Sequence, residues 1–428
     1  MDNRPPMSPQ SLLDAAADLL RAVLCFDYPA DAVVSRYFRD HHRLGQRERA
    51  TLAETSYAVL RKKVLFDHFA RSGVGLRERR LAILGFAARR DFLYSALTPA
   101  ERDWLDVCDA ADVALLPPAC RHNLPDWLAA RLTQQLGAPA FDQLAAALLQ
   151  PAPLDLRVNA LQDKRDAVRK ELHQAGITAE PTPYSPWGLR IAGKPAINRL
   201  DVFRRGAIEV QDEGSQLLAL LTDARRGQMA ADFCAGAGGK TLALGAAMRS
   251  TGRLYAFDVS AHRLAALKPR LARSGLSNVY PVAIAHERDE RIKRLAGKMD
   301  RVLVDAPCSG LGTLRRNPDL KWRQPESAIA ELTAKQSAIL SGAARLVKPG
   351  GRLVYATCSL LTDENEAIAA AFDAAHPDFA SAPVADTLQA LKVPDAAALC
   401  GDNGLYLRLW PHQHATDGFF AAAWTRKE

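Results

Sequence analysis

The sequence has none of the long apolar segments that mark membrane and secreted proteins. No hydrophobic run approaches the ~18 residues that a membrane span requires. The N-terminal stretch MDNRPPMSPQ contains no apolar core of a secretory signal. We therefore expect a cytoplasmic protein that does not enter a membrane.

Cysteine is also scarce, and its pattern argues against two common uses of the residue. The count of seven is odd, the spacing is wide and no Cys-x-x-Cys pair occurs, which argues against a disulfide framework. His412 and His414 have no cysteine partners at zinc-ligand spacing, so we expect no metal site. The positions are Cys25, Cys108, Cys120, Cys234, Cys308, Cys358 and Cys400.

What the sequence does contain is an ordinary globular composition with a basic excess. Its 428 residues suggest two or three domains, and 48% of them are hydrophobic, enough for buried cores. The net charge of +8 is uneven, because residues 1–150 have 19 basic and 18 acidic side chains while the rest have 37 and 30. A basic C-terminal part fits a polyanionic partner, although charge alone fits a merely soluble basic protein equally well.

The first region, residues 1–149, predicts an all-helical domain. Apolar residues recur here with a helical period, and no run alternates like a strand. We expect Ser11 to cap the first helix and Asn123 to start a later one, with Pro125 in its first turn.

The second region, residues 150–205, predicts a small α/β subdomain behind a proline-rich linker at 150–154. A strand is expected at 154–158, a helix at 163–174 and a loop at 181–188.

The third region, residues 206–428, alternates strands with helices. This order predicts an α/β fold, with a parallel sheet covered by helices on both faces. A last strand is expected to run antiparallel at an edge of the sheet. The expected strands cover 229–234, 253–258, 279–285, 301–305, 352–357 and 419–424, with a helix at 260–274.

A glycine-rich turn closes the first strand of the third region, in the stretch Asp232-Phe-Cys-Ala-Gly-Ala-Gly-Gly-Lys-Thr241. Such a turn lets the backbone approach a ligand and directs helix N–H groups toward it. Asp258 ends the next strand and can accept hydrogen bonds from both ribose hydroxyls. A Walker A loop would need glycine at Cys234, and a dinucleotide fingerprint would need glycine at Thr241. The pattern therefore favours a methionine-bearing nucleoside over either ligand, and a cofactor site over a plain turn.

Two cysteines follow the ends of later strands, in Asp305-Ala-Pro-Cys-Ser-Gly-Leu-Gly312 and in Ala356-Thr-Cys-Ser359. Ligands bind beyond the carboxyl ends of strands in open parallel sheets, so we expect Cys308 and Cys358 to face one cleft beside the cofactor. The alternative is that both are small core residues, as we accept for the other cysteines. The acid, the rigid proline and the permissive glycine around Cys308 favour function.

Two thiols and a carboxyl group suit the methylation of carbon 5 of cytosine. A thiolate that adds to carbon 6 makes carbon 5 nucleophilic, and an acid at N3 stabilises the electron-rich ring. A base then removes the carbon 5 proton, and the thiolate leaves. The residues alone leave open which cysteine attacks.

A basic loop follows the first cysteine loop. Arg315, Arg316, Lys321 and Arg323 are candidates for phosphate contacts, and Trp322 is a candidate for stacking on a base. A solvated charged surface is the alternative, and the position directly after the cysteine loop favours RNA binding.

These motifs together resemble the RsmB/NOP2/NSUN family of RNA 5-methylcytosine methyltransferases. The segment 44–61 also resembles the NusB-like domain of the bacterial members. The resemblance implies a class I Rossmann-like methyltransferase domain at 206–428, a helical NusB-like RNA-binding domain at 1–149 and a small α/β RNA-binding subdomain at 150–205. The matching stretches are 210–216, 234–241, Asp258, 305–312, 317–322, 357–359 and 417–420.

The resemblance also implies a role for each site residue. Cys358 is the nucleophile, Cys308 assists product release, Asp305 holds the cytosine and Lys240 orders the cofactor side of the cleft. The implied cofactor is S-adenosyl-L-methionine, and the implied partner is RNA, with 16S rRNA expected. We also expect the protein to be a monomer. The implied cofactor-binding residues are Cys234, Ala235, Gly236, Ala237, Gly238, Gly239, Lys240, Asp258, Arg263 and Asp305.

Two positions depart from the family pattern. Gly236-Ala237 stands where members usually have Ala-Pro, and the segment 283–287 has no clean match to the acid that usually lies near the adenine. Glu287 and His286 are the local candidates for that place, with a solvated loop the simpler interpretation of His286.

Two other functions fit part of the sequence. A methyltransferase for a small molecule or protein would keep the cofactor site and make both cysteines incidental. A non-catalytic RNA-binding or ribosome-assembly factor would need only the helical domain and the basic surface. The combination of Asp305, Cys308 and Cys358 argues against both, because neither alternative requires it.

Overall fold

The computed structural model describes residues 7–193, 195–401 and 403–428. The chain forms two compact units, which we call the helical unit (Met1–Pro151 and Leu314–Glu326) and the sheet unit (Ala152–Thr313 and Ser327–Glu428). The second segment of the helical unit is an excursion of the chain, which returns to the sheet unit at Ser327. The predicted division into three domains stays a prediction.

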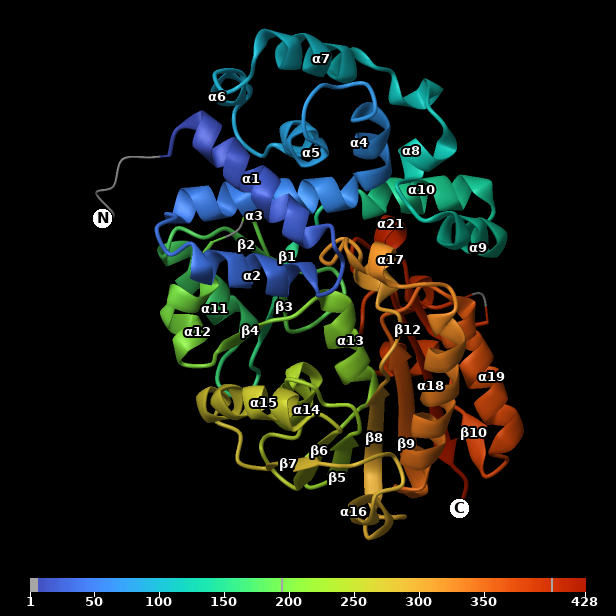
Figure 1. Cartoon of the computed structure of the whole chain (residues 1–428). Helices are drawn as coiled ribbons and strands as arrows, with labels where there is room; N and C mark the ends of the chain where they lie inside the picture. Colours follow the sequence, from blue (N-terminus) through green and yellow to red (C-terminus); the bar gives the residue numbers. More distant parts are fainter. Residues whose placement is uncertain (1–6, 194, 402) are drawn as a thin grey trace. The chain divides into compact units, whose positions relative to one another are not determined.

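The helical unit is built from amphipathic helices (Figure 1), and those from α1 to α8 share one core. In the first helix, Leu12, Ala16, Leu19 and Val23 recur at helical spacing and are all buried. The predicted helical character of this region is confirmed. The helices are α1 (Pro9–Val23), α2 (Ala30–Asp40), α3 (Gln46–Arg61), α4 (Lys63–Phe69), α5 (Arg77–Gly85), α6 (Arg90–Tyr94), α7 (Pro99–Ala110), α8 (Pro118–His122), α9 (Asp126–Leu136), α10 (Ala138–Leu148) and α17 (Leu320–Arg323).

Two predicted helix starts in this unit were wrong. Ser8 rather than Ser11 caps α1, since the Ser8 side chain accepts the Ser11 N–H. Asn123 ends α8 in the left-handed conformation, with φ of 52°. Its side chain also accepts the Leu65 N–H at 3.0 Å, a long-range contact that local sequence patterns do not reveal.

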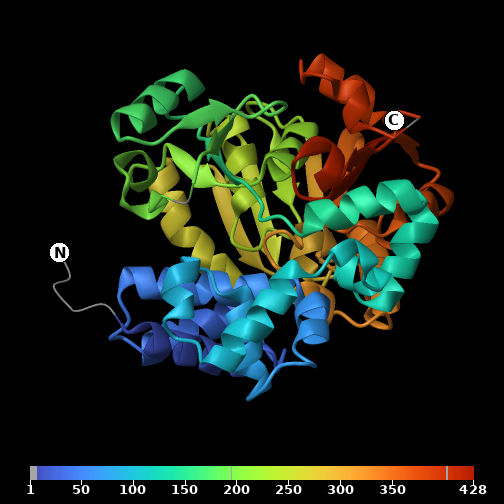
Figure 2. The ribbon, with the colours of Figure 1, turned by 90° about the horizontal axis from the view of Figure 1, so that it is seen from above.

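The sheet unit begins with a small antiparallel sheet in the order β2-β3-β1-β4. Helices α11 and α12 pack on it through Val168, Leu172 and Val202 (Figures 1 and 2). The predicted strand at 154–158 and helix at 163–174 are confirmed. The elements are β1 (Leu154–Val158), α11 (Arg165–Gln174), β2 (Ala179–Pro181), β3 (Gly188–Ile191), α12 (Asp201–Arg204) and β4 (Ile208–Val210).

The second sheet is an α/β sheet in the order β10-β12-β9-β8-β5-β6-β7, with β11 paired to β12. Strands β7, β6, β5, β8 and β9 are parallel. Its strands are β5 (Met229–Asp232), β6 (Arg253–Asp258), β7 (Val279–Ala283), β8 (Met299–Asp305), β9 (Val347–Thr357), β10 (Phe379–Ser381), β11 (Leu407–Leu409) and β12 (Phe419–Arg426). The helices of this part are α13 (Glu213–Leu221), α14 (Gly239–Ala247), α15 (Ala261–Ser274), α16 (Glu290–Lys293), α18 (Ala328–Ala344), α19 (Glu366–Ala375), α20 (Val384–Ala390) and α21 (Pro411–His414).

Alternation along the strands gives this sheet two apolar faces. Val302 and Val304 of β8 share a core with residues of α18 and α19, whereas Leu303 between them packs with residues of α13, α14 and α20. Helices therefore cover both faces, as the sequence predicted.

The last strand was placed wrongly at an edge. β12 is antiparallel, as expected, but it pairs with β9 on one side and with β10 and β11 on the other. Its burial agrees with an inner position, because Phe420 and Ala421 are fully buried and Trp424 is nearly so.

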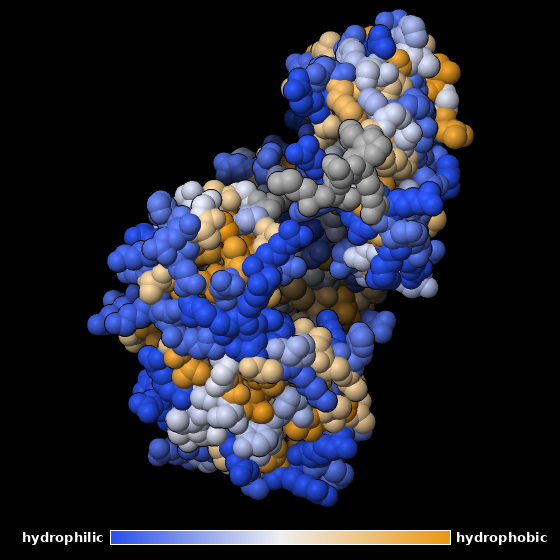
Figure 3. All heavy atoms as spheres, turned by 90° about the vertical axis from the view of Figure 1, so that its left-hand side faces the viewer, coloured by the Kyte–Doolittle hydropathy of each residue, from blue (hydrophilic) through white to orange (hydrophobic). Residues whose placement is uncertain are grey.

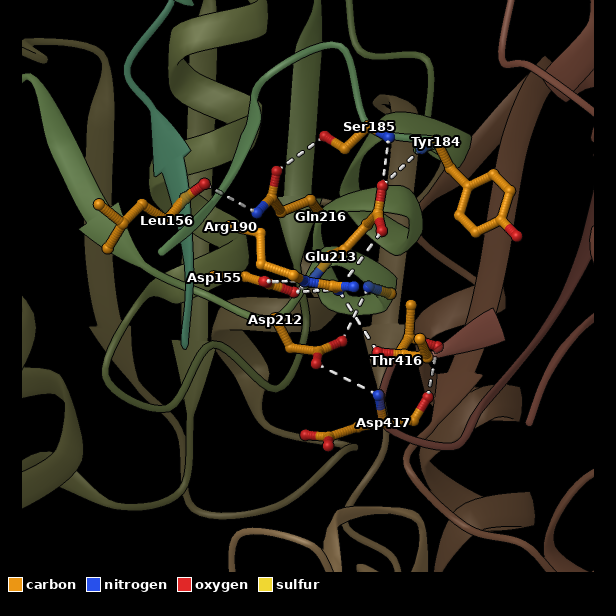
Figure 4. Close-up of polar contacts among 12 residues, drawn as sticks. Asp155, Leu156, Tyr184, Ser185, Arg190, Asp212, Glu213, Gln216, Thr416 and Asp417 are labelled. Carbon is orange, nitrogen blue, oxygen red and sulfur yellow. Dashed lines mark hydrogen bonds and ion pairs between the residues drawn. The ribbon is translucent and has the colours of Figure 1, made fainter. Parts of the chain in front are cut away.

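A buried polar network joins the small sheet to helix α13 within the sheet unit (Figure 4). Glu213 at the start of α13 accepts the backbone N–H groups of Tyr184 and Ser185 at 2.6 and 2.8 Å. Asp155 of β1 accepts two hydrogen bonds from Arg190 of β3, at 2.8 and 3.0 Å, and Arg190 also lies 3.8 Å from Glu213. Burial raises the pKa of Glu213.

Hydrophilic side chains cover most of the face seen in Figure 3, with hydrophobic ones in small groups between them. Among the described residues, no helix combines the length and the apolar content needed to cross a bilayer.

Candidate active site

The glycine-rich turn forms the loop between β5 and α14. Gly238 has φ of +85°, and a Cβ there would lie 2.1 Å from the Leu267 side chain, so only glycine fits. The Gly236 N–H donates to Asp258 Oδ2 at 2.8 Å, while Asp258 Oδ1 accepts the Ser260 N–H at 2.7 Å. The loop and the carboxylate at the end of β6 therefore meet, as parallel neighbouring strands require.

Asp232, at the end of β5, is a residue of this loop that the sequence analysis did not single out. Its Oδ2 accepts the Thr241 hydroxyl at 2.7 Å, and its buried Oδ1 has no hydrogen-bond partner among the described residues. Burial raises the pKa of Asp232 to about 7, with the Thr241 hydrogen bond opposing and the Asp305 charge adding to the shift. Its position at the end of a strand, like that of Asp258 and Asp305, was the available signal.

The outer side of the loop is tied to the small sheet by an ion-pair cluster. Arg270 of α15 donates to the Ala237 carbonyl at 2.7 Å and pairs with Glu209 of β4 at 2.9 Å. Arg273 also pairs with Glu209, at 2.5 Å. Arg157, fully enclosed, contacts the Gly239 carbonyl at 3.5 Å. The small sheet thus holds the glycine-rich loop through Glu209, Arg157 and Arg270. The spacing of residues in the sequence did not indicate these contacts.

Lys240 and Asp305 form the ion pair at the centre of the site. Lys240 stands in the first turn of α14 and its Nζ donates to Asp305 Oδ2, at the end of β8, at 2.6 Å. Burial alone lowers the pKa of Lys240, but the charge of Asp305 and the hydrogen bond to it outweigh burial and raise that pKa. The lysine is therefore held as a cation beside the acid.

Cys308 and Cys358 meet beside this pair. Their sulfurs lie 3.4 Å apart, since parallel register sets Asp305 beside Ala356 and both loops leave the sheet at the same end. Both side chains are partly exposed, and all seven cysteines are free thiols. The sequence analysis expected this meeting of two thiols in one place.

Close backbone contacts hold the two cysteine loops together. The Gly312 N–H donates to the Cys358 carbonyl at 2.8 Å, and the Gly418 N–H donates to the Gly312 carbonyl at 2.8 Å. A Cβ at Gly312 would lie 2.1 Å from the Gly418 oxygen. This approach explains why glycine follows the Pro-Cys loop and why the Asp417-Gly-Phe-Phe420 stretch belongs to the same structure.

The surroundings of Cys308 shift the pKa of this thiol. The contact with Cys358 raises the pKa of Cys308 well above its usual value, and burial and the Glu364 charge add to this effect. The charge of Cys358 in turn contributes to the raised pKa of Lys240. These surroundings therefore favour the protonated form of Cys308.

Two family models match the chain. Residues 219–425 match the 16S rRNA methyltransferase RsmB/F, and residues 124–198 match the ferredoxin-like domain of RsmF/B-like methyltransferases. A probable ribosomal RNA small subunit methyltransferase B from Synechocystis is 36% identical over 76% of this chain and 70% of its own length. The chain belongs to the RsmB/RsmF family of RNA methyltransferases. The predicted family resemblance and enzyme class are thereby confirmed.

Solved structures agree with this family fold. The structure of the protein PH0851 aligns over 100% of both chains with a TM-score of 0.79 and 26% identity. A methyltransferase homolog from Pyrococcus horikoshii covers 73% of this chain and 100% of its own, with a TM-score of 0.61 and 28% identity. They confirm the predicted fold class, a helical N-terminal region followed by a Rossmann-like methyltransferase sheet.

The basic loop of this family member lies within the helical unit rather than in the sheet unit. Lys321 is 2% exposed and donates through Nζ to the Arg61 carbonyl at 2.9 Å, and Trp322 donates to the Leu60 carbonyl at 2.8 Å. Arg315 is also buried and donates to the Pro151 carbonyl at 3.2 Å. These side chains fasten the loop to the helical unit, which differs from the phosphate and base contacts expected for them. Arg316 and Arg323 are partly exposed.

The remaining predicted site residues lie at the edge of the site. Arg263 is exposed near the start of α15, where its N–H donates to the capping Ser260 hydroxyl at 3.3 Å. The His286 ring accepts the Arg288 N–H at 3.1 Å in an exposed turn, and Glu287 lies 3.7 Å from Arg288. Asp289, which the sequence analysis did not consider, accepts two backbone N–H groups of this turn. Among the described residues, no group of three or more His, Cys, Asp or Glu side chains has the arrangement of a metal site.

Proposed function

We propose that this enzyme transfers a methyl group from S-adenosylmethionine to carbon 5 of a cytosine in 16S ribosomal RNA. The observation that carries the proposal is the pair of thiols 3.4 Å apart, at the same end of the sheet as the Lys240–Asp305 ion pair. Methyl transfer to a small molecule or a protein has no use for two adjacent thiols. The names of the relatives support small-subunit ribosomal RNA as the substrate.

The residues around the glycine-rich loop fit the proposed cofactor. S-Adenosylmethionine supplies a sulfonium-bound methyl group when it is bound. Each carboxylate oxygen of Asp258 has a second acceptor position for a ribose hydroxyl besides its backbone partner. The unpartnered Oδ1 of Asp232 is a second acceptor for a ligand donor. The further residues proposed to line the cofactor are Cys234, Ala235, Gly236, Ala237, Gly238, Gly239, Lys240, Arg263 and Asp305.

The proposed reaction uses each central residue once. The Cys358 thiolate bonds to C6 of cytosine, and the ring electron pair moves to C5. Asp305, held by Lys240, shares a proton with N3, and this proton stabilises the electron-rich ring. C5 would take the methyl carbon as the bond from that carbon to the sulfonium sulfur breaks, with the electron pair remaining on the sulfur. C5 then loses its proton to a base. The returning electron pair then breaks the C6–S bond and expels the Cys358 thiolate. We assign Cys308 to this release step, because its sulfur lies 3.4 Å from that of Cys358.

Replacement of each thiol in turn tests the attack step and the release step separately. Cys358→Ala is expected to lose methyl transfer by at least about 1000-fold, because no other group makes C5 nucleophilic. Cys308→Ala is expected to accumulate a covalent protein–RNA adduct, visible as a shifted band on a denaturing gel. Cys25→Ala, at an exposed cysteine of the helical unit, is the matched control. Normal turnover in both active-site variants with no adduct would contradict the mechanism.

The identity of the substrate is tested in cells. Bisulfite sequencing of ribosomal and transfer RNA from a deletion strain should show one 16S cytosine that loses its methyl group. Loss confined to transfer RNA would contradict the proposed substrate, and failure of the purified protein to bind S-adenosylmethionine would favour a non-catalytic assembly factor.

A further inference from the structure

A buried carboxylate lies between the two cysteine loops. Glu364, at the end of the 3-10 turn Thr362–Glu364, is 0% exposed. Its Oε1 accepts the Ser309 N–H at 2.8 Å and the Gln336 side chain at 2.9 Å. Its Oε2 accepts the hydroxyl of Ser309 at 2.5 Å and the hydroxyl of Ser359. Burial of a carboxylate without hydrogen-bond partners costs free energy. The four neutral donors around Glu364 offset that cost and fix its side chain in place.

The donors follow the two thiols directly in sequence. Ser309 comes after Cys308, and Ser359 comes after Cys358, and the two serine hydroxyls lie 3.2 Å apart. One carboxylate therefore holds both loops one residue beyond the sulfurs, which themselves lie 3.4 Å apart. Because its side chain is fully buried, Glu364 acts on the thiols through these serines rather than by contact with a substrate.

Hydrogen bonds of neighbouring residues restrict the movement of the Glu364 segment. Gln336 of α18 also donates to the Pro307 carbonyl at 3.0 Å, and the Tyr355 hydroxyl donates to the Glu364 carbonyl at 2.7 Å. Asn365 accepts the Thr357 hydroxyl at 2.5 Å and donates to the Ser359 carbonyl at 3.1 Å. The stretch 364–365 is thus bound to both loops and to the sheet beneath them.

We propose that Glu364 is a positioning residue for methyl transfer, which holds the Cys308 and Cys358 loops at the separation that attack and release require. The inference rests on the proposed function, in which both thiols act on one pyrimidine. Catalytic geometry is sensitive to displacement, since a shift of about 1 Å can cost about 100-fold in rate.

The charge of Glu364 has a second consequence for Cys308. The ionisable groups that interact with this thiol are Cys358, Glu364 and the Tyr355 hydroxyl. Among them the Glu364 charge contributes to the raised pKa of Cys308, after the Cys358 contact and burial. Removal of the negative charge therefore lowers the pKa of Cys308, and the thiol ionises at lower pH.

The test is Glu364→Gln, which keeps the shape and loses the charge. We expect kcat to fall about 100-fold while the KM for S-adenosylmethionine stays within about twofold, because the cofactor loop is untouched. Alkylation of Cys308 by iodoacetamide, followed by mass spectrometry without RNA, should occur at lower pH than in the parent. Glu366→Gln, two positions along and paired with Arg408 at 3.4 Å, is the matched control.

The outcomes distinguish the inference from the proposed function. A kcat within twofold of the parent, an equal loss in Glu366→Gln, or an unchanged alkylation profile of Cys308 would overturn the role of Glu364. Full activity of Cys358→Ala would instead overturn the proposed function. If Glu364→Gln fails to fold, Ser359→Ala removes a single link to the carboxylate. That variant is then expected to lose about tenfold in kcat with unchanged cofactor affinity, and parental kcat in it would overturn the inference.

Discussion

Two buried lysines of this methyltransferase show how surroundings set the state of a side chain. Lys240 has Asp305 at 2.6 Å, and this partner raises its pKa in spite of burial. Lys321 instead donates to the Arg61 carbonyl and lies over the Trp322 ring. Burial together with the Arg61 charge lowers the pKa of Lys321 to about 7. The first lysine is kept as a cation for the site, while the second is close to losing its proton at neutral pH.

The lowered pKa of Lys321 predicts a pH-dependent stability. Between pH 7 and 10.5 the unfolded chain binds this proton and the folded chain does not, so stability rises with pH. We expect the parent to gain about 1 kcal/mol per pH unit relative to Lys321→Met in this window. Urea denaturation at several pH values measures the difference.

The matched control is Lys298→Met. Lys298 is exposed, and its Nζ also donates to a backbone carbonyl, at 2.8 Å, so its removal should leave the pH profile parallel to that of the parent. Parallel profiles for Lys321→Met and the parent would show that Lys321 does not titrate in this way.

At the scale of elements, the glycine-rich loop between β5 and α14 depends on a strand of the other sheet. Glu209 of β4 neutralises Arg270 and Arg273, and Arg270 holds the Ala237 carbonyl of the loop. The buried Arg157 also lies in the field of Glu209, which opposes the lowering of its pKa by burial. Loss of this one carboxylate would leave three arginines close together behind the loop.

We therefore predict that Glu209→Gln weakens cofactor binding. The affinity for S-adenosylmethionine is expected to fall about tenfold, the effect of about 1.4 kcal/mol of lost positioning. Isothermal titration calorimetry measures it. Glu180→Gln, at an exposed glutamate of the same sheet whose side chain is 71% accessible, should bind like the parent. A lowered melting temperature with unchanged affinity would show that Glu209 serves stability alone.

At the scale of the whole molecule, the net charge of +8 predicts that RNA binding weakens as the salt concentration rises. Each neutralised phosphate of a single strand contributes about 0.7 to the slope of log affinity against log salt. Arg316 is a partly exposed arginine of the excursion, so Arg316→Gln is expected to reduce the slope by about that amount. Filter binding across salt concentrations measures it.

The first segment of the helical unit supplies a control for that measurement. Arg89→Gln removes an exposed arginine whose side chain is 85% accessible and pairs with Asp91, and it should leave the slope unchanged. An equal slope for Arg316→Gln and the parent would exclude Arg316 as a phosphate contact, as burial already argues for Lys321.

The sequence alone determined the features that depend on local order. Alternation and spacing predicted six of the eight strands of the large sheet but only β1 of the small one. The rule that ligands lie beyond parallel strand ends predicted the meeting of Cys308 and Cys358. Both follow from the backbone, since strand period and parallel register do not depend on distant side chains.

Only the tertiary structure decided what depends on residues far apart in the chain. Three features are of this kind: β12 lies inside the sheet, Lys321 and Trp322 lie in the helical unit, and Glu364 binds Ser309 and Ser359. Each brings together segments that share no sequence pattern. Buried polar groups must form hydrogen bonds within the protein. The packing of the whole unit determines which group becomes the partner.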